Sequence, residues 1–105
     1  MISEDEILKM IKWIVLEKEP SAKIYLYGSR AKGTSKPDSD WDLLILLNKD
    51  KITWDIKKNI TYLLYDLEFE TGEVISPMIY SAGEWDFKYK ITPFYLNIMR
   101  EGRVL

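Results

Sequence analysis

Five consecutive apolar residues, from Leu43 to Leu47, constrain the fold more than any other stretch of this sequence. Successive side chains of a strand point to opposite faces of its sheet. A strand that is apolar at every position is therefore covered on both faces, which is typical of a strand at the centre of a sheet. The run is also far too short to span a membrane as a helix.

Hydrophobic spacing and breaker residues predict further helices and strands around this central strand. Apolar residues recur at helical spacing after Ser3, which forms a capping box with Glu6, and Pro20 ends that helix. Pro77 cannot donate a backbone hydrogen bond, so its strand is expected at a sheet edge or at a bulge. Strands are predicted at 23–27, 41–47 and 74–80, short helices at 84–89 and 94–100, and a second long helix marked by Ile56, Ile60, Leu63, Leu64 and Leu67 with its cap at Gly72. The alternating order predicts one α/β (α+β) domain over residues 1–105.

The residue types that are absent exclude several kinds of site. The chain has no cysteine and no histidine, which excludes disulfides, thiolate nucleophiles, histidine bases and zinc sites with these ligands. Any catalysis must use carboxylates, hydroxyls, lysine, arginine or a bound metal. The net charge of −2 argues against a nucleic-acid-binding protein. The acidic N-terminus lacks a signal-peptide pattern, so we expect a soluble, cytoplasmic protein with no membrane association.

One segment combines a phosphate-binding pattern with a pair of carboxylates. Gly28 and Ser29 stand where a strand ends and a helix begins, and backbone N–H groups at such a place favour phosphate. Asp40 and Asp42 stand two residues apart at the start of the central strand, so both carboxylates point to one face, roughly 6.6 Å apart along the chain. Adjacent carboxylates repel unless a cation neutralises them, and oxygen ligands beside phosphates select Mg²⁺ or Mn²⁺. The pattern indicates metal-assisted phosphoryl or nucleotidyl transfer.

Each part of this segment also has a simpler interpretation. A Gly-Ser pair after a strand is often only a turn, and an Asp-x-Asp pair at a strand start is often solvated. Arg30 and Lys32 are consistent with ordinary surface charge. The combination favours a site, because the aspartates directly precede a strand buried on both faces, where unpaired charge is costly.

The segment Gly28-Ser29-Arg30-Ala31-x-Gly33, followed by Ser39-Asp40-x-Asp42-Leu43, resembles the signature of minimal nucleotidyltransferases of the DNA polymerase β-like superfamily. The resemblance implies a nucleotidyltransferase fold, with a small mixed sheet of three or more strands and flanking helices. It implies that Gly28, Ser29, Arg30 and Ser39 bind a nucleoside triphosphate, expected to be ATP. It also implies that Asp40 and Asp42 are catalytic and bind Mg²⁺ or Mn²⁺. A nucleotidyl group would then pass to a hydroxyl of a protein or small molecule.

The third predicted strand departs from this family pattern. A third carboxylate is normally found there, and the position that aligns with it is Ser76. The nearby acids Glu68, Glu70 and Glu73 are expected to be solvated charges around a helix end. Two hypotheses therefore stay open. One is an active nucleotidyltransferase, and the other is a weakly active or inactive nucleotide-binding module that acts as the antitoxin-like partner of a HEPN-type protein in a toxin–antitoxin pair.

The aromatic residues have a structural interpretation and a functional one. The four tryptophans and seven tyrosines are expected mainly as core or half-buried packing, although base stacking is the alternative. By strand alternation, Trp41 should point away from the aspartate pair. Tyr27 directly precedes Gly28 and is expected near the site.

Overall fold

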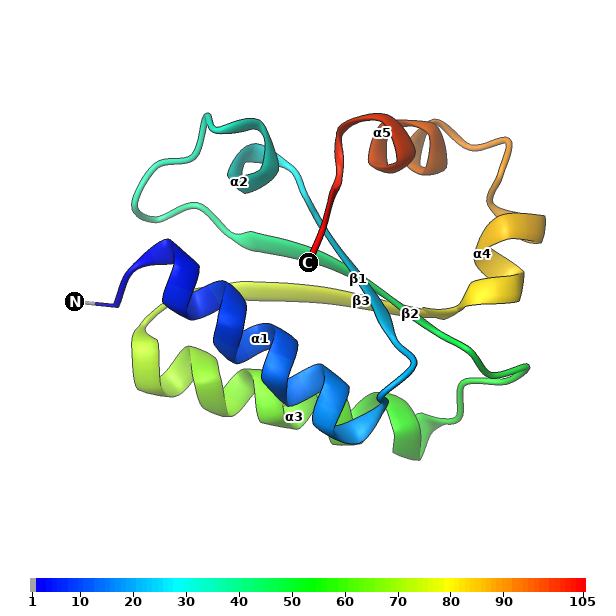
Figure 1. Cartoon of the computed structure of the whole chain (residues 1–105), viewed down its shortest axis with the longest axis horizontal. Helices are drawn as coiled ribbons and strands as arrows, with labels where there is room; N and C mark the ends of the chain where they lie inside the picture. The colour runs from blue at the N-terminus through cyan, green and yellow to red at the C-terminus, as the bar shows by residue number, and fades with distance from the viewer. Residues whose placement is uncertain (1) are drawn as a thin grey trace.

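A four-stranded mixed sheet forms the centre of the computed structural model, which describes residues 2–105 (Figure 1). The strand order is β3-β2-β1-β4, with β1 antiparallel to β2 and β4, and with β2 parallel to β3. The strands are β1 (Lys23–Tyr27), β2 (Trp41–Leu47), β3 (Ile75–Ser81) and the short β4 (Arg103–Val104). The helices are α1 (Glu4–Lys18), α2 (Ser29–Lys32), α3 (Trp54–Thr71), α4 (Ala82–Lys88) and α5 (Pro93–Glu101). This is the mixed α+β fold that the sequence predicts.

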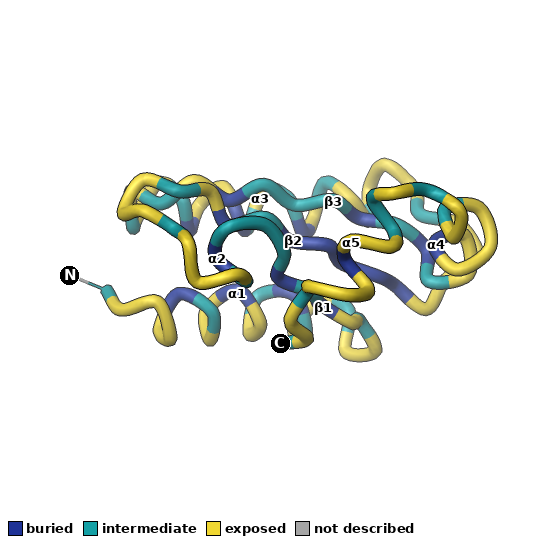
Figure 2. The backbone as a smooth tube through the Cα atoms, turned by 90° about the horizontal axis from the view of Figure 1, so that it is seen from above, coloured by how far each residue is buried: buried dark blue, intermediate teal, exposed yellow. Residues whose placement is uncertain are grey.

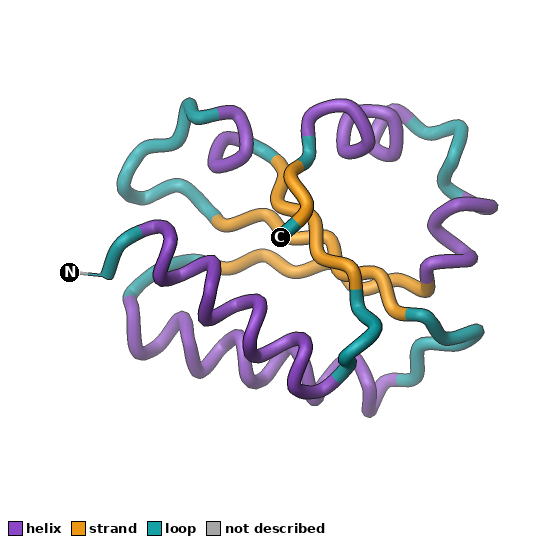
Figure 3. The backbone as a smooth tube through the Cα atoms, viewed as in Figure 1, coloured by secondary structure: helices purple, strands orange, loops and turns teal. Residues whose placement is uncertain are grey.

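Helices α1 and α3 lie side by side over one face of the sheet (Figures 1 and 3). The sheet contributes alternate strand residues to this layer, including Leu26, Leu43 and Ile45. They pack against Ile11 of α1 and Leu64 of α3, and all five side chains are fully buried. Burial of one such side chain stabilises the fold by roughly 1.5–3 kcal/mol, so this layer is the main core.

The opposite face of the sheet is covered by α4 and α5. Leu44 and Leu46 of β2 pack there against Trp85 of α4 and Ile98 of α5. Seen from above, β2 is buried along almost its whole length, while the outer turns of the surrounding helices are exposed (Figure 2). The prediction of a central strand covered on both faces is confirmed.

Strand β3 lies at one edge of the sheet and pairs with β2 alone. Pro77 sits in the middle of this strand, opposite Leu43. An edge strand leaves one side of its backbone without a neighbour, so the missing N–H of proline costs no ladder hydrogen bond there. The predicted edge position is confirmed.

The ends of the long helices follow the predicted signals. Ser3 Oγ accepts a hydrogen bond from the backbone N–H of Glu6 at 3.2 Å, and α1 ends at Lys18, before Pro20. Helix α3 ends at Thr71 and is capped by Gly72, whose φ of 76° lies in the left-handed region that favours glycine. Among residues 2–105, no helix combines the length and the apolar character needed to cross a membrane.

The tryptophans divide into two buried and two exposed residues. Trp41 and Trp85 are buried in the two layers, as expected. Trp13 and Trp54 are 66% and 68% exposed, so the expectation of core packing is wrong for these two. Both stand on helix faces that point away from the sheet, which residue type alone does not reveal.

Candidate active site

The turn between β1 and α2 brings Gly28 against the carboxylate of Asp42. Tyr27 and Asp42 are directly opposed in the antiparallel β1–β2 pair, so the next residue, Gly28, passes close to the start of β2. Its φ of 73° and ψ of −156° lie in a region that is open almost only to glycine. A Cβ atom added at Gly28 would collide with Oδ2 of Asp42. The backbone turn and the close approach to the carboxylate therefore both require glycine.

The aspartate pair and Ser76 gather on one face of the sheet. Asp42 and Ser76 are register partners in the parallel β2–β3 pair. Ser76 Oγ donates a hydrogen bond to Asp40 Oδ2 at 3.4 Å. This is the face that carries α4 and α5, and Trp41 lies in the layer on the other side, as strand alternation predicts. Ser76 thus stands beside the aspartate pair, at the position that was aligned with the third carboxylate.

The aspartate pair carries negative charge that no side chain of the described residues 2–105 neutralises through an ion pair. Partial burial, followed by the charge of Asp40, raises the pKa of Asp42 above its ordinary value. Burial, followed by the charge of Asp42, likewise raises the pKa of the Tyr27 hydroxyl. Burial and the neighbouring carboxylate act in the same direction on both groups, and a bound cation would act in the opposite direction.

The guanidinium of Arg30 lies away from the aspartate pair, on the Trp41 side of the sheet. It stacks over the Trp41 ring, 4.3 Å from the ring centroid, and its side chain is only 5% exposed. It donates hydrogen bonds to Glu4 Oε1 at 2.8 Å and to the backbone carbonyl of Ser39 at 2.9 Å. Since these partners hold the guanidinium, the structure does not bring this predicted nucleotide ligand to the aspartates.

Ser29 and Ser39 occupy different surroundings. Ser29 follows Gly28 directly and opens α2, so its backbone begins one residue after the close approach of Gly28 to Asp42. Ser39 is committed to its own loop, because its Oγ accepts from the backbone N–H of Lys36 at 2.8 Å and its carbonyl accepts from Arg30. Of the four predicted nucleotide ligands, Gly28 therefore lies against Asp42 and Ser29 directly follows it, while Arg30 and Ser39 hold the loop that leads to β2.

Two of the three acids near the end of α3 have partners that the sequence did not reveal. Glu73 Oε2 accepts a hydrogen bond from Trp41 Nε1 at 3.1 Å and lies 3.5 Å from Arg30 Nη2. Glu68 Oε2 accepts from the first backbone N–H of β3 at 2.9 Å. The expectation of solvated charges is therefore wrong for Glu68 and Glu73, whereas Glu70 is exposed. Glu73 holds the guanidinium on the Trp41 side and is not aimed at the aspartate pair.

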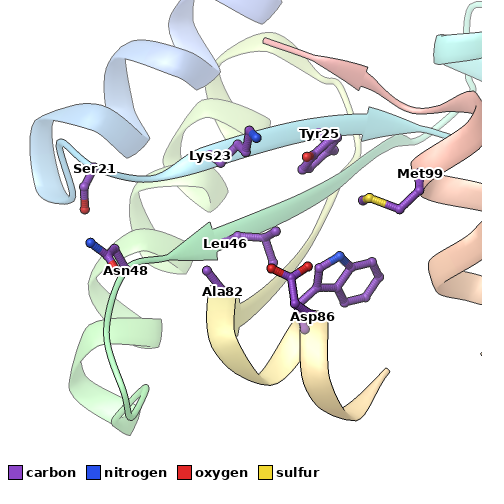
Figure 4. Close-up of a pocket in the computed structure, with 9 residues that line it drawn as sticks. Ser21, Lys23, Tyr25, Leu46, Asn48, Ala82, Asp86 and Met99 are labelled. Atoms are coloured by element: carbon purple, nitrogen blue, oxygen red, sulfur yellow. The ribbon is translucent and has the colours of Figure 1, made fainter. Parts of the chain in front are cut away.

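A separate pocket of about 330 Å³ opens at the other end of the same sheet face (Figure 4). Its walls come from β1, the end of β2, α4 and α5, and include Lys23, Leu46, Asn48, Asp86 and Met99. None of the Gly-Ser or Asp-x-Asp residues lines this pocket. The residues of the motif therefore lie at the start of β2 and not in this cavity.

Comparison with known proteins assigns the family. A family model described as a nucleotidyltransferase domain matches residues 8–102, which is most of the chain. The chain belongs to the nucleotidyltransferase domain family. No curated protein sequence matched it.

Two solved structures similar to this nucleotidyltransferase domain are toxin–antitoxin structures. A crystal structure of a toxin–antitoxin with AMP-PNP matches with a TM-score of 0.58 and 18% identity, over 98% of this chain and 72% of that chain. A mutant of the toxin–antitoxin MntA–HpeT matches with a TM-score of 0.56 and 18% identity, over 100% of this chain and 72% of that chain. At this identity the two structures establish the fold. Together with the family model they confirm the resemblance seen in the sequence.

The donor set of this nucleotidyltransferase domain fits a hard divalent cation. Asp40, Asp42 and Ser76 offer two carboxylates and a hydroxyl, and oxygen ligands are those that Mg²⁺ and Mn²⁺ prefer. Over residues 2–105, no three acidic side chains come together in a metal-binding cluster. Asp40 and Asp42 are the residues that would hold a cation, with the weaker Ser76 Oγ beside them.

Proposed function

We propose that this domain binds ATP together with Mg²⁺ or Mn²⁺ at the start of β2. Asp40 and Asp42 would hold the cation, and Gly28 with Ser29 would receive the phosphates. The observation that carries the proposal is the approach of Gly28 to the Asp42 carboxylate, where a side chain would collide. The glycine turn thus lies directly beside a carboxylate pair that has no counter-charge among the described residues, and a metal-bound phosphate needs both features close together. The AMP-PNP of one similar structure supports ATP as the nucleotide.

The reaction that this arrangement supports is transfer of a nucleotidyl group to a hydroxyl of a protein or small molecule. The acceptor oxygen forms a bond to the α-phosphorus as the bond to pyrophosphate breaks. A cation held by Asp40 and Asp42 would neutralise charge on the phosphate oxygens. Burial and the charge of Asp42 raise the pKa of the Tyr27 hydroxyl, which donates a hydrogen bond to Met78 Sδ at 3.5 Å.

A second function, a nucleotide-binding module with little or no transfer activity, is favoured by Ser76. The family pattern places a carboxylate there to help activate the acceptor hydroxyl, and serine is a poor replacement because it is neutral and weakly basic. In this case the domain would act as the antitoxin-like partner of a HEPN-type protein. The toxin–antitoxin nature of both similar structures supports such a pairing.

Transfer of AMP from α-labelled ATP distinguishes the two functions. Mg²⁺-dependent labelling of an acceptor by the parent, lost in Asp42→Asn, would support the transferase. Tight Mg²⁺–ATP binding without labelling, with or without a co-purified partner, would support the binding module. Absence of Mg²⁺–ATP binding would contradict both.

The alignment of Ser76 can be tested in the same assay. Robust labelling that survives Ser76→Ala but is abolished by Glu70→Gln or Glu73→Gln would show that the third acid comes from the end of α3 or from the turn before β3. We expect neither glutamine variant to affect labelling, because Glu73 is bound on the Trp41 side and Glu70 is exposed.

A further inference from the structure

The outer face of α3 carries a row of exposed aromatic residues. Trp54, Tyr62, Tyr65 and Phe69 are spaced so that they fall on one side of the helix. Their exposed fractions are 68%, 53%, 51% and 93%. The rings of Tyr62 and Tyr65 stack with their centroids 6.3 Å apart. These four residues are called the aromatic stripe below.

The aromatic stripe is not part of the hydrophobic core. Helix α3 packs on the sheet through Ile60, Leu64 and Leu67, which lie on the opposite side of the helix. The helix therefore presents a second apolar face that its own domain does not use. Several large exposed aromatic side chains on one helix face indicate an interaction site. It lies on the α1–α3 side of the sheet, away from the aspartate pair, and so is independent of the proposed nucleotide site.

The charges along α3 differ between its two halves. The first half carries Lys57 and Lys58 with one aspartate, and the second half carries Asp66, Glu68 and Glu70 with no basic residue. Two parallel copies of the helix would set the acidic halves together, which is unfavourable. Two antiparallel copies set each lysine-bearing half beside an acidic half and also oppose the helix dipoles. The charge pattern therefore matches a second copy of the same helix in antiparallel orientation.

We propose that the aromatic stripe is a homodimer interface, formed by antiparallel packing of α3 on α3 of a second copy. A register that sets Phe69 against Trp54 of the second copy also brings Lys58 close to Asp66 of the second copy. Each contact then occurs twice, as two-fold symmetry requires. The four rings expose roughly 500 Å² per copy, so the pair buries about 1,000 Å², which is the lower end of specific interfaces. The dimer is accordingly weak and reversible.

Sedimentation equilibrium of the whole chain, from about 10 µM to 1 mM, tests the interface. We expect a monomer–dimer equilibrium whose dissociation constant rises about tenfold or more in Phe69→Ser, because a buried aromatic ring is lost from each copy. Phe87→Ser is the matched control. Phe87 is also 93% exposed but lies on α4, and its replacement should leave the dissociation constant unchanged.

A charge exchange tests the antiparallel register. Lys58→Glu and Asp66→Lys should each raise the dissociation constant about fivefold, since each change affects two symmetry-related pairs. The double variant should return to the parent value. A parent that stays monomeric at 1 mM would overturn the proposal, as would a dimer that Phe69→Ser leaves intact. Failure of the double variant to recover would overturn the antiparallel arrangement.

Discussion

At the start of β2, charged side chains on one face of the sheet have partners of opposite charge, whereas those on the other face have none in the described part of the chain. On the Trp41 side, the Arg30 guanidinium is buried but is met by Glu4, Glu73 and a backbone carbonyl. On the other side, the side chains of Asp40 and Asp42 have only the hydroxyl of Ser76 as a hydrogen-bond partner among residues 2–105. Both charged groups belong to one short motif, and within the described residues only the guanidinium is paired with opposite charge.

This difference indicates a structural role for Arg30 and a ligand-binding role for the aspartates. A charge that the chain itself compensates stabilises the fold and has no need of a ligand. A pair of like charges without compensation costs stability and is relieved when a cation binds. We therefore assign Arg30 to the architecture of the loop, and we propose that the aspartates bind a metal with its nucleotide.

The largest effect is expected on the compensated side. Arg30→Ala removes the ion pairs with Glu4 and Glu73, the hydrogen bond to the Ser39 carbonyl and the stacking on Trp41. We expect the free energy of unfolding in urea to fall by about 2–3 kcal/mol. Lys32→Ala is the control. Its pair with Glu101 is exposed, so the loss should stay below about 0.5 kcal/mol. Equal losses in both variants would contradict the assigned role of Arg30.

Gly28 tests the approach to the aspartates. Gly28→Ala forces a side chain into a glycine-only conformation and against Asp42, so we expect a loss of about 2 kcal/mol and of Mg²⁺–ATP binding. Gly33→Ala is matched, because Gly33 also has a positive φ, of 77°, but open space around it. It should lose about 1 kcal/mol and keep its ATP affinity, as measured by calorimetry. If both variants bind ATP with the same affinity, Gly28 is needed only for the backbone turn and not for nucleotide binding.

Ser76→Asp makes the uncompensated side more negative. A third carboxylate beside Asp40 and Asp42 should lower the free energy of unfolding without metal by about 1 kcal/mol. Excess Mg²⁺ or Mn²⁺ should reverse this loss, whereas it should affect Ser76→Ala no more than the parent. Urea denaturation with EDTA measures the loss of stability, and urea denaturation with metal measures its reversal. A stability loss that metal does not reverse would show that Ser76 is not beside a cation site.

The smallest effect is the pH dependence of Asp42→Asn. The pKa of Asp42 is raised in the folded state, so its ionised form costs stability above that pKa. Below the ordinary pKa both states are protonated and the cost disappears. Without metal, Asp42→Asn should therefore be more stable than the parent at neutral pH, and this advantage should shrink towards about pH 3. If the stability advantage of Asp42→Asn grew on acidification, it would contradict a raised pKa of Asp42.

The sequence was sufficient to predict the layers and the shared face of the aspartates. The apolar run from Leu43 to Leu47 predicts a central strand, and Pro77 predicts an edge strand, because both signals are local. The spacing of Asp40 and Asp42 sets their shared side by strand geometry alone.

The position of the Arg30 side chain could not be predicted in this way. Arg30 is separated by 26 residues from Glu4 and by 43 from Glu73, so its direction depends on how α1 and the end of α3 pack. The exposure of Trp13 and Trp54 depends in the same way on which helix face meets the sheet. A short motif does not determine the position of a side chain whose partners come from distant segments of the sequence.

Calorimetric titration of Mg²⁺–ATP into the parent and into Asp42→Asn tests the central claim most directly. We expect the parent to bind with Mg²⁺ and to lose most of this affinity with EDTA. Asp42→Asn should bind at least about tenfold more weakly, a difference of about 1.4 kcal/mol, with its circular dichroism spectrum unchanged. Equal affinity in the two proteins, or binding that is indifferent to EDTA, would contradict a metal–nucleotide site at the aspartate pair.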